Sequence, residues 1–358
     1  MFSKIDEFID GVLKSGVPFC DMAIYHKGKE VYRRTEGDLD VEGLVTARGD
    51  EMYNVYSASK LITCTAALML CERGVISLDD KLAKYMPEFE KMTVKCDTGI
   101  YEAKNSITVR HLFSMTSGIP YDVYSPSLKR YRRETDGRCP TRLLPKYLAL
   151  EPLVCEPGER WEYGLSHDLL AALIEIVTGE KFGEFVRKNI FMPLGMESTT
   201  FSHDEDTVGK LAPQYNYNQK LSAPVPCAKR NIYNFGSEYE AGGAGCITTL
   251  DDYMRFLEGL RLGGLISLDT LDLMAKNQID ESSRDSFWLY DMGYGYGLGV
   301  RCPRDSSISD FGWGGAAGAF FMIDREKEIS AIFLQHVLSA PIEPYKSNLG
   351  SVISDIFD

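Results

Sequence analysis

The chain has 358 residues, 44% of them hydrophobic and 25% charged, which is the composition of a globular protein and excludes a disordered or fibrous one. Its 39 lysines and arginines against 52 aspartates and glutamates give a net charge of −13, which disfavours nucleic acids and anionic membranes as partners. The length suggests roughly two domains and suffices to bury a core without disulfides or a structural metal.

The predicted elements begin with a helix over residues 4–14, where apolar side chains recur at helical spacing. Two extended runs, 20–26 and 30–34, flank a glycine turn and predict a β-hairpin. Residues 57–73 form an apolar helical pattern that a glycine ends. From about 75 to 235 the pattern indicates short helices and long loops.

Inside that stretch, residues 166–178 predict one clear helix, and the polar segment 202–234 is expected to be a loop. A further helix over 250–262 leads into glycine-spaced extended segments, the last two of which are joined by a hairpin turn. These segments are 293–302, 318–323 and 329–337. A final helix is predicted over 344–357.

Strands and helices therefore gather at both ends of the chain, with helices between them. We expect an α/β (α+β) fold in which one antiparallel sheet is flanked by the N- and C-terminal helices and carries a mostly helical insertion. Residues 1–62 and 240–358 are expected to form a discontinuous sheet domain. Residues 63–239 are expected to form a mostly helical domain with long loops, and the active site is expected at the interface.

The cysteines suggest a cellular compartment. They are nine in number, which is odd, and none has C-x-x-C spacing, so neither a disulfide framework nor a zinc ribbon is expected. The first seven residues lack the apolar core of a signal peptide, and no apolar run reaches the ~18 residues that would span a membrane. We therefore expect a reduced, cytoplasmic, soluble protein.

A candidate nucleophile lies at the start of the apolar helix. Ser57-Ala58-Ser59-Lys60 is the chain's one S-x-x-K sequence. Side chains three residues apart share a helix face, so Lys60 can reach the Ser57 hydroxyl and act as the base that a serine nucleophile needs. The plainer interpretation is a serine helix cap followed by a solvent-facing lysine, and the motif alone does not decide between them.

Other catalytic motifs are missing or out of context. The chain contains no G-x-S-x-G, no H-E-x-x-H and no P-loop. Residues 312–317 match G-x-G-x-x-A, but strand-like residues follow instead of a helix, so a dinucleotide site is not expected.

Three longer stretches carry a resemblance to a known family. They are residues 53–60 (YNVYSASK), 71–81 (CERGVISLDDK) and 107–119 (ITVRHLFSMTSGI). Together they resemble the serine β-lactamase and penicillin-binding-protein superfamily, in particular its class C-like branch, which also contains esterases. The resemblance extends from about residue 20 to 337 and implies the β-lactamase/transpeptidase-like fold.

The resemblance assigns further site residues. Tyr163 matches the tyrosine of the family's Y-x-N element, whereas Leu165 replaces its asparagine. Leucine cannot hydrogen-bond a substrate amide, which puts recognition of β-lactams or peptides in doubt. Leu165 is nonetheless expected to contact the substrate.

The family's K-T-G strand is matched by residues 312–318, where Trp313 replaces the cation. The resemblance implies that Trp313, Gly314 and Gly315 contact the substrate. It also implies an oxyanion hole formed by the backbone N–H groups of Ser57 and Ala316.

The expected chemistry is acyl transfer. Ser57 attacks an ester carbonyl, its proton passes to the Lys60–Tyr163 pair, and water activated by Tyr163 hydrolyses the acyl-enzyme. No metal or cofactor is expected.

The leading function is a serine hydrolase, in the first place a carboxylesterase on small-molecule esters or amides. A β-lactamase or D-alanyl peptidase, an acyltransferase and a non-catalytic ligand-binding protein remain alternatives. No nucleic acid or membrane partner is expected, and the oligomeric state is left open.

Overall fold

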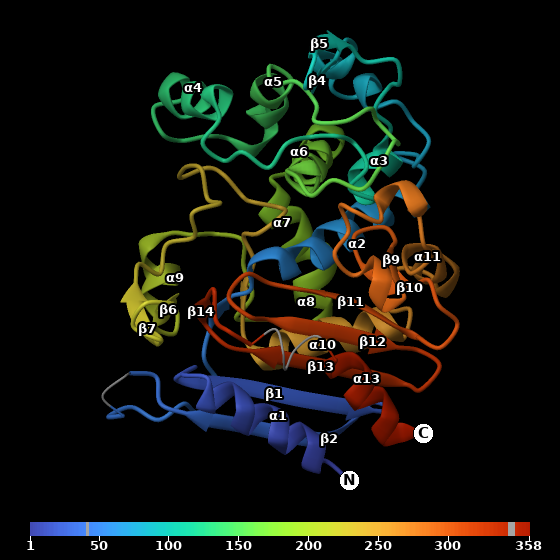
Figure 1. The fold of residues 1–358 in the computed structure, drawn as a ribbon. Helices are drawn as coiled ribbons and strands as arrows, with labels where there is room; N and C mark the ends of the chain where they lie inside the picture. Colours follow the sequence, from blue (N-terminus) through green and yellow to red (C-terminus); the bar gives the residue numbers. More distant parts are fainter. Residues whose placement is uncertain (41–42, 343–347) are drawn as a thin grey trace.

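The computed structural model describes residues 1–40, 43–342 and 348–358. Its centre is a seven-stranded antiparallel sheet with the strand order β2-β1-β13-β12-β11-β10-β9 (Figure 1). The strands are β1 (Phe19–His26), β2 (Lys29–Gly37), β9 (Tyr294–Tyr296), β10 (Arg301–Pro303), β11 (Asp310–Gly314), β12 (Phe320–Asp324) and β13 (Ile329–Leu334). The two ends of the chain thus build one sheet, as the strand pattern predicts.

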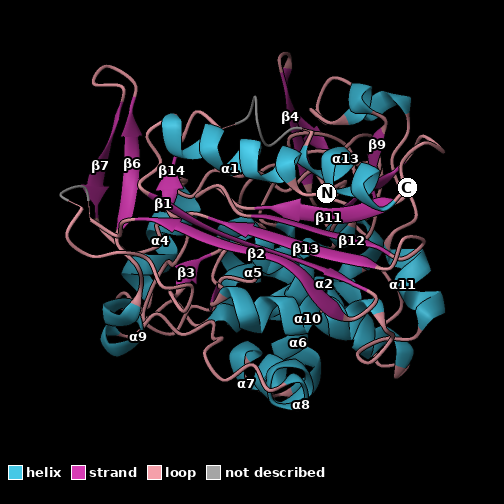
Figure 2. Cartoon of the chain, turned by 90° about the horizontal axis from the view of Figure 1, so that it is seen from below, coloured by secondary structure: helices cyan, strands magenta, loops and turns pink. Residues whose placement is uncertain are grey.

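The sheet is covered on both faces, which explains why its middle strands are apolar throughout. All residues of β12 and β13 are buried. Strands that are covered on both faces lose the alternation of polar and apolar side chains. Figure 2 shows α1 (Ser3–Lys14) and α13 (Leu349–Ser354) on one face and α10 (Leu250–Arg261) on the other.

Two long helices, α2 (Ser59–Glu72) and α6 (Ser166–Thr178), form the centre of the helical part and pack against each other. Every residue from Ser59 to Leu70 is buried, and the α6 helix ends at Gly179 in the left-handed conformation. The 3₁₀ turn η1 (Tyr56–Ala58) precedes α2 directly.

The remaining elements are short. The helices are α3 (Val109–Phe113), α4 (Pro126–Glu134), α5 (Leu144–Leu148), α7 (Phe182–Val186), α8 (Met192–Leu194), α9 (Glu205–Lys210) and α11 (Leu268–Met274). The 3₁₀ turns are η2 (Leu82–Lys84), η3 (Pro87–Phe89), η4 (Thr141–Leu143), η6 (Glu281–Ser283), η7 (Tyr290–Met292) and η8 (Asp355–Phe357), and η5 (Arg187–Phe191) is π-helical. The small sheets pair β3 (Tyr53–Asn54) with β8 (Ile247–Thr248), β4 (Thr93–Cys96) with β5 (Gly99–Glu102), and β6 (Gln214–Asn218) with β7 (Ala223–Cys227) and β14 (Val337–Leu338).

The helices predicted near residues 4–14, 57–73, 166–178 and 250–262 and the first hairpin are confirmed. The loop predicted over 202–234 is wrong, because it contains α9, β6 and β7. The β6 strand forms a local antiparallel hairpin with β7 and pairs in parallel with β14, at the other end of the chain; only the second partner could not be read from the local sequence.

The predicted strand at 293–302 is two strands, β9 and β10, and the run at 329–337 ends as β13 before β14 begins. Of the final helix predicted over 344–357, residues 344–347 lie outside the described residues. The division into two domains at residues 62 and 239 stays a prediction. Across the ranges that the structure describes, no helix is both long and apolar enough to cross a bilayer.

Candidate active site

Ser57 lies in the tight turn between β3 and α2. The residue before it, Tyr56, has φ of 47°, in the left-handed region that side chains other than glycine rarely adopt. Two hydrogen bonds hold this conformation. The Tyr56 phenol donates to Gln214 Oε1 at 2.8 Å, and the Ser59 hydroxyl donates to the Tyr56 carbonyl at 2.5 Å. The turn leaves Ser57 partly exposed, while Ala58, Ser59 and Lys60 are buried.

Two side chains converge on the Ser57 hydroxyl. The Tyr163 phenol donates to Ser57 Oγ at 2.7 Å, and Lys60 Nζ donates to the same oxygen at 3.3 Å. Lys60 Nζ also lies 4.6 Å from the centre of the Tyr163 ring. The phenol and the amine are therefore each within direct proton-transfer reach of the Ser57 hydroxyl, which is the geometry that an activated serine requires.

Lys60 is held from its other side by the backbone of Gly243, which separates it from a buried carboxylate. Its Nζ donates to the Gly243 carbonyl at 2.7 Å, and its side chain is almost entirely buried. The backbone of Gly243 stands between Lys60 and Asp168, since a Cβ built there would lie 3.5 Å from Lys60 Nζ and would overlap Asp168 Oδ2. The Tyr239 phenol donates to Asp168 Oδ1 at 2.8 Å.

The Asp168 carboxyl titrates under opposing influences. Burial raises its pKa, while the positive charge of Lys60 and the hydrogen bond from Tyr239 act to lower it. Asp168 is thus the buried acidic group that faces the Lys60 amine.

His167 lies under the same site but is not built for proton transfer to a substrate. It is completely buried, and its Nε2 lies 3.1 Å from the Phe113 carbonyl oxygen. Burial, followed by the charge of Lys60, lowers the pKa of His167 to about 3. The ring is therefore neutral at physiological pH.

The end of β11 approaches the nucleophile's turn closely. A Cβ on Gly315 would overlap the carbonyl oxygen of Val55, so only glycine permits this approach. Ala316 follows as an exposed residue, and both it and Ser57 line one cavity. The pairing of the Ser57 and Ala316 N–H groups as an oxyanion hole stays a prediction.

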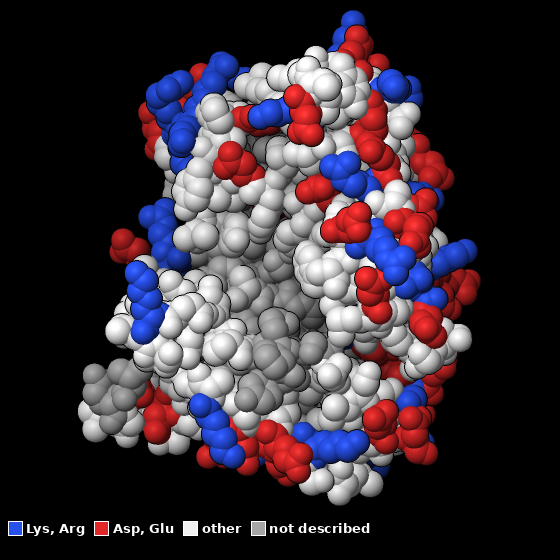
Figure 3. Space-filling model, viewed as in Figure 1, with Lys and Arg blue, Asp and Glu red and all other residues white. Residues whose placement is uncertain are grey.

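The cavity has a volume of 540 Å³, large enough for a small organic molecule. Most of its described lining is aromatic or aliphatic: Tyr121, Tyr163, Tyr233, Trp288, Leu289, Met292, Tyr294, Trp313 and Phe320. Gly314, Gly315, Ala316, Gly350, Arg301 and Ser57 complete it. The face shown in Figure 3 is hollowed in its middle, and charged side chains gather around the edge of that hollow.

Comparison with known proteins identifies the family. The family model described as Beta-lactamase matches residues 5–343. The chain belongs to the Beta-lactamase family. The resemblance noted in the sequence is thereby confirmed, and the whole sheet and the helical part fall within the match.

Three similar proteins place this Beta-lactamase-family chain more closely. Esterase EstB of Burkholderia gladioli is 26% identical over 365 residues, which cover 93% of this chain and 89% of that protein. The structure of EstCE1, a hydrolase with promiscuous acyltransferase activity, has a TM-score of 0.78 at 23% identity and covers 99% of both chains. Simvastatin synthase (LovD) of Aspergillus terreus has a TM-score of 0.80 at 23% identity, covering 99% of this chain and 98% of that one. The two structures show that the fold is shared.

Among the residues expected to contact substrate, Trp313, Gly314 and Gly315 line the cavity of this family member. Trp313 is fixed by neighbouring rings, lying 6.1 Å from Tyr163 and 5.1 Å from Tyr296 between centroids. Leu165 does not line the cavity. It lies at the start of α6, and its apolar side chain packs into the main hydrophobic core.

Several residues of the site were not singled out in the sequence. Asp168 is an acidic residue directly before the apolar run of the predicted helix, five positions after Tyr163, and this was a usable signal. Tyr239 and Gly243 gave no signal in the sequence, because only the folded chain brings Tyr239 to Asp168 and Gly243 to Lys60. The lining rings of Tyr121, Tyr233 and Trp288 likewise come from segments without a motif.

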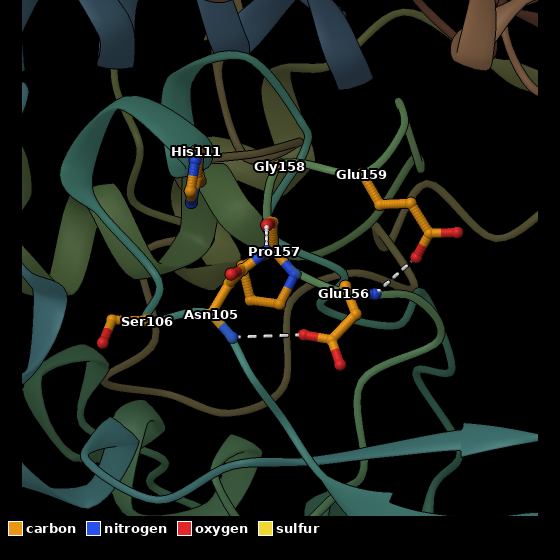
Figure 4. A pocket seen from close by; sticks show the side chains of 7 residues that line it. All are labelled: Asn105, Ser106, His111, Glu156, Pro157, Gly158 and Glu159. Atoms are coloured by element: carbon orange, nitrogen blue, oxygen red, sulfur yellow. Dashed lines mark hydrogen bonds between the residues drawn. The ribbon is translucent and has the colours of Figure 1, made fainter.

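A second cavity, of 570 Å³, is not equipped for chemistry (Figure 4). Its carboxylates accept from the loop backbone: Glu156 from Asn105 N–H at 3.3 Å, and Glu159 from Glu156 N–H at 2.9 Å. His111 accepts from the Thr108 N–H and caps α3. Within residues 1–40, 43–342 and 348–358, no group of three or more His, Cys, Asp or Glu side chains could hold a metal ion.

Proposed function

We propose that this protein is a serine hydrolase that cleaves small-molecule esters through an acyl-enzyme. The observation that carries the proposal is the pair of contacts on Ser57 Oγ, 2.7 Å from the Tyr163 phenol and 3.3 Å from Lys60 Nζ, at the wall of a cavity. The similarity to Esterase EstB over most of both chains supports the same class of reaction.

The proposed reaction begins when Ser57 Oγ attacks the ester carbonyl carbon. The serine proton passes to the Lys60–Tyr163 pair. Before this step one of the two groups is deprotonated, so the pair can accept a proton. Lys60 is suited to carrying the positive charge, since it donates to the Gly243 carbonyl and faces Asp168. Tyr163 is then the proton acceptor, and its phenolate is stabilised by the neighbouring ammonium.

The tetrahedral intermediate collapses as the carbon–oxygen bond to the alcohol breaks, and Tyr163 returns the proton to that oxygen. Water then attacks the acyl-enzyme carbonyl and gives its proton to Tyr163. The acid leaves when the bond to Ser57 Oγ breaks, and Tyr163 returns the proton to that oxygen, which restores the starting state. We assign the backbone N–H groups of Ser57 and Ala316 to the oxyanion in both steps.

The lining of the cavity supports ester rather than β-lactam or peptide substrates. Trp313 stands where the family carries a cation, and the Leu165 side chain is buried in the core instead of facing a substrate amide. The wall of aromatic and aliphatic side chains favours an apolar acyl or alcohol group, whose transfer from water is favourable.

The test uses a short-chain nitrophenyl ester and a chromogenic cephalosporin as paired substrates. We expect turnover of the ester, its loss in Ser57→Ala, and full activity in Ser77→Ala, which changes a serine outside the site. A fluorophosphonate should label Ser57. Cephalosporin turnover with an inert ester would instead identify a β-lactamase. An absence of both turnover and labelling would support a binding protein.

Hydrolysis and acyl transfer share their first half, so the same experiment should include an alcohol acceptor. We expect the free acid as the main product, and a predominant new ester would identify an acyltransferase. For the cellular location we propose a reducing compartment such as the cytoplasm, because all nine cysteines are free thiols.

A further inference from the structure

One charged side chain reaches the wall of the cavity onto which Ser57 opens. Among the described residues that line it, Arg301 of β10 is the only acidic or basic one. Its side chain is 6% exposed. Burying a guanidinium is costly unless its donors are satisfied, so its place beside an apolar cavity needs a physical reason.

Asp310 of β11 supplies the opposite charge. Its Oδ2 lies 2.5 Å from Nη1 of Arg301, and the Tyr294 phenol donates to its Oδ1 at 2.9 Å. The rings of Tyr294 and Phe320, which also line the cavity, lie 4.5 and 5.3 Å from the guanidinium carbon. The carboxylate balances the charge of Arg301, and the two rings give it cation–π contacts.

The two terminal nitrogens of Arg301 nevertheless lack an aligned hydrogen bond. Neither Nη1 nor Nη2 has a hydrogen-bond partner among the described residues, and Asp310 Oδ2 has no donor, because their close approach is not aligned along an N–H bond. Another buried pair shows the usual arrangement. Arg261 donates to Glu258 through Nε at 2.9 Å and through Nη2 at 2.8 Å. Of the two pairs, the one at the cavity, Arg301 with Asp310, is therefore the one with unpaired hydrogen-bond donors.

We infer that Arg301 and Asp310 form a polar subsite that binds a neutral oxygen, such as a ketone, ether or hydroxyl, on a part of the substrate away from the reacting ester. Because the Arg301 side chain forms part of the wall, a modest turn of the guanidinium directs an N–H toward a bound molecule. This inference rests on the proposed ester hydrolysis and adds the substrate class, an apolar ester with a second oxygen function.

A neutral oxygen fits this subsite better than a carboxylate. Asp310 already balances the charge of Arg301, and a substrate anion would come to lie beside a buried carboxylate. A neutral acceptor satisfies the free N–H groups without adding charge. The two rings that contact the guanidinium suit the hydrocarbon that carries such an oxygen.

The test compares nitrophenyl esters of three acyl groups of equal length: hexanoyl, its analogue with a ketone on the penultimate carbon, and the glutaryl half-ester. A mirrored series of acetates carries the same three groups on the alcohol side. In one of the two series we expect kcat/KM for the ketone to exceed that of the alkyl ester by about tenfold or more, as for a hydrogen bond from a charged donor. The carboxylate should be the poorest of the three.

The variant that removes the subsite is the double substitution Arg301→Met with Asp310→Leu, which leaves no unpaired buried charge. We expect the ratio of ketone to alkyl kcat/KM to fall to about one. This ratio does not depend on the fraction of folded enzyme. The matched control, Arg261→Met with Glu258→Leu, removes a buried pair outside the cavity and should keep the wild-type ratio.

Equal kcat/KM for ketone and alkyl esters in both series would overturn the inference and leave the esterase proposal standing. A preference for the carboxylate, or a ketone preference that survives in the double variant, would overturn it as well. If no ester is hydrolysed, calorimetric titration of Ser57→Ala with the methyl esters of the three acids decides. The ketone should bind more tightly than the alkyl ester, and equal affinities would refute the subsite.

Discussion

Replacing Tyr163 by phenylalanine separates the role of the phenol from that of the ring. The substitution removes the 2.7 Å hydrogen bond to Ser57 Oγ. It keeps the ring that stacks on Trp161 at 5.5 Å and on Trp313 at 6.1 Å. The lost bond should lower the free energy of unfolding by about 0.5–1.5 kcal/mol. At about 2–4 °C per kcal/mol, the melting temperature should change by a few degrees.

The effect on catalysis should be far larger. A positioned acid–base group contributes about 10²–10⁴ in rate, so kcat of Tyr163→Phe should fall by about that factor, which corresponds to about 2.7–5.5 kcal/mol. The assay is steady-state and single-turnover hydrolysis of a nitrophenyl ester, with thermal unfolding measured on the same samples. Tyr121→Phe is the matched control, because its ring lies 5.2 Å from Tyr163 and lines the same cavity.

We expect Tyr121→Phe to retain most of the wild-type kcat. The reasoning would be refuted if Tyr163→Phe melted normally and kept kcat within about tenfold of wild type, well short of the usual acid–base contribution. Lys60 alone would then take the serine proton, and the hydrogen bond from the phenol would serve only to orient the nucleophile.

Three further predictions concern the surroundings of the site. Gly315→Ala should abolish most ester turnover, because its Cβ would overlap the Val55 carbonyl and push β11 from the nucleophile's turn; unchanged kinetics would contradict this. Asp168→Asn should lower kcat by about tenfold, equivalent to about 1.4 kcal/mol, with KM unchanged, because the negative charge near Lys60 is lost; a change in KM alone would argue against it. Burial lowers the pKa of His336 to about 4, so the unfolded chain binds a proton that the folded chain refuses. The share of the stability due to His336 should therefore be fully present above about pH 6.5 and should fall toward pH 4 by on the order of 3 kcal/mol, so His336→Gln should reduce the slope of stability with pH in melting experiments.

The parts of the site that the sequence predicted are those encoded locally. The spacing of Ser57 and Lys60 places both on one helical turn, and their side chains meet at 3.3 Å. The role of Tyr163 was predicted from a family motif, because no local rule brings a phenol to a serine 106 positions away. Leu165 illustrates the limit of such transfer. Leu165 aligns with a substrate-binding asparagine, but an apolar side chain at that position packs into the core instead of contacting the substrate.

The parts that the sequence missed depend on distant contacts. The β6 strand has a polar sequence that resembles a loop, and it pairs both with its neighbour β7 and with β14, more than a hundred positions later. Gly243 meets Lys60 across 183 positions through a backbone carbonyl, a group that every residue has. The pairing of Arg301 with Asp310 needs two neighbouring strands in register, and neither residue stands in a motif.

The aromatic cluster around Tyr163 gathers all three tryptophans of the chain. Trp288 and Trp313 line the cavity, and Trp161 stacks on Tyr163 and meets Trp288 edge to face. The tryptophan fluorescence of the protein therefore originates entirely from rings in or next to the contact with Tyr163, which itself donates to the reacting serine. Binding at the site can therefore be followed by tryptophan emission without an added label. Local unfolding that leaves this cluster intact would not change the same emission.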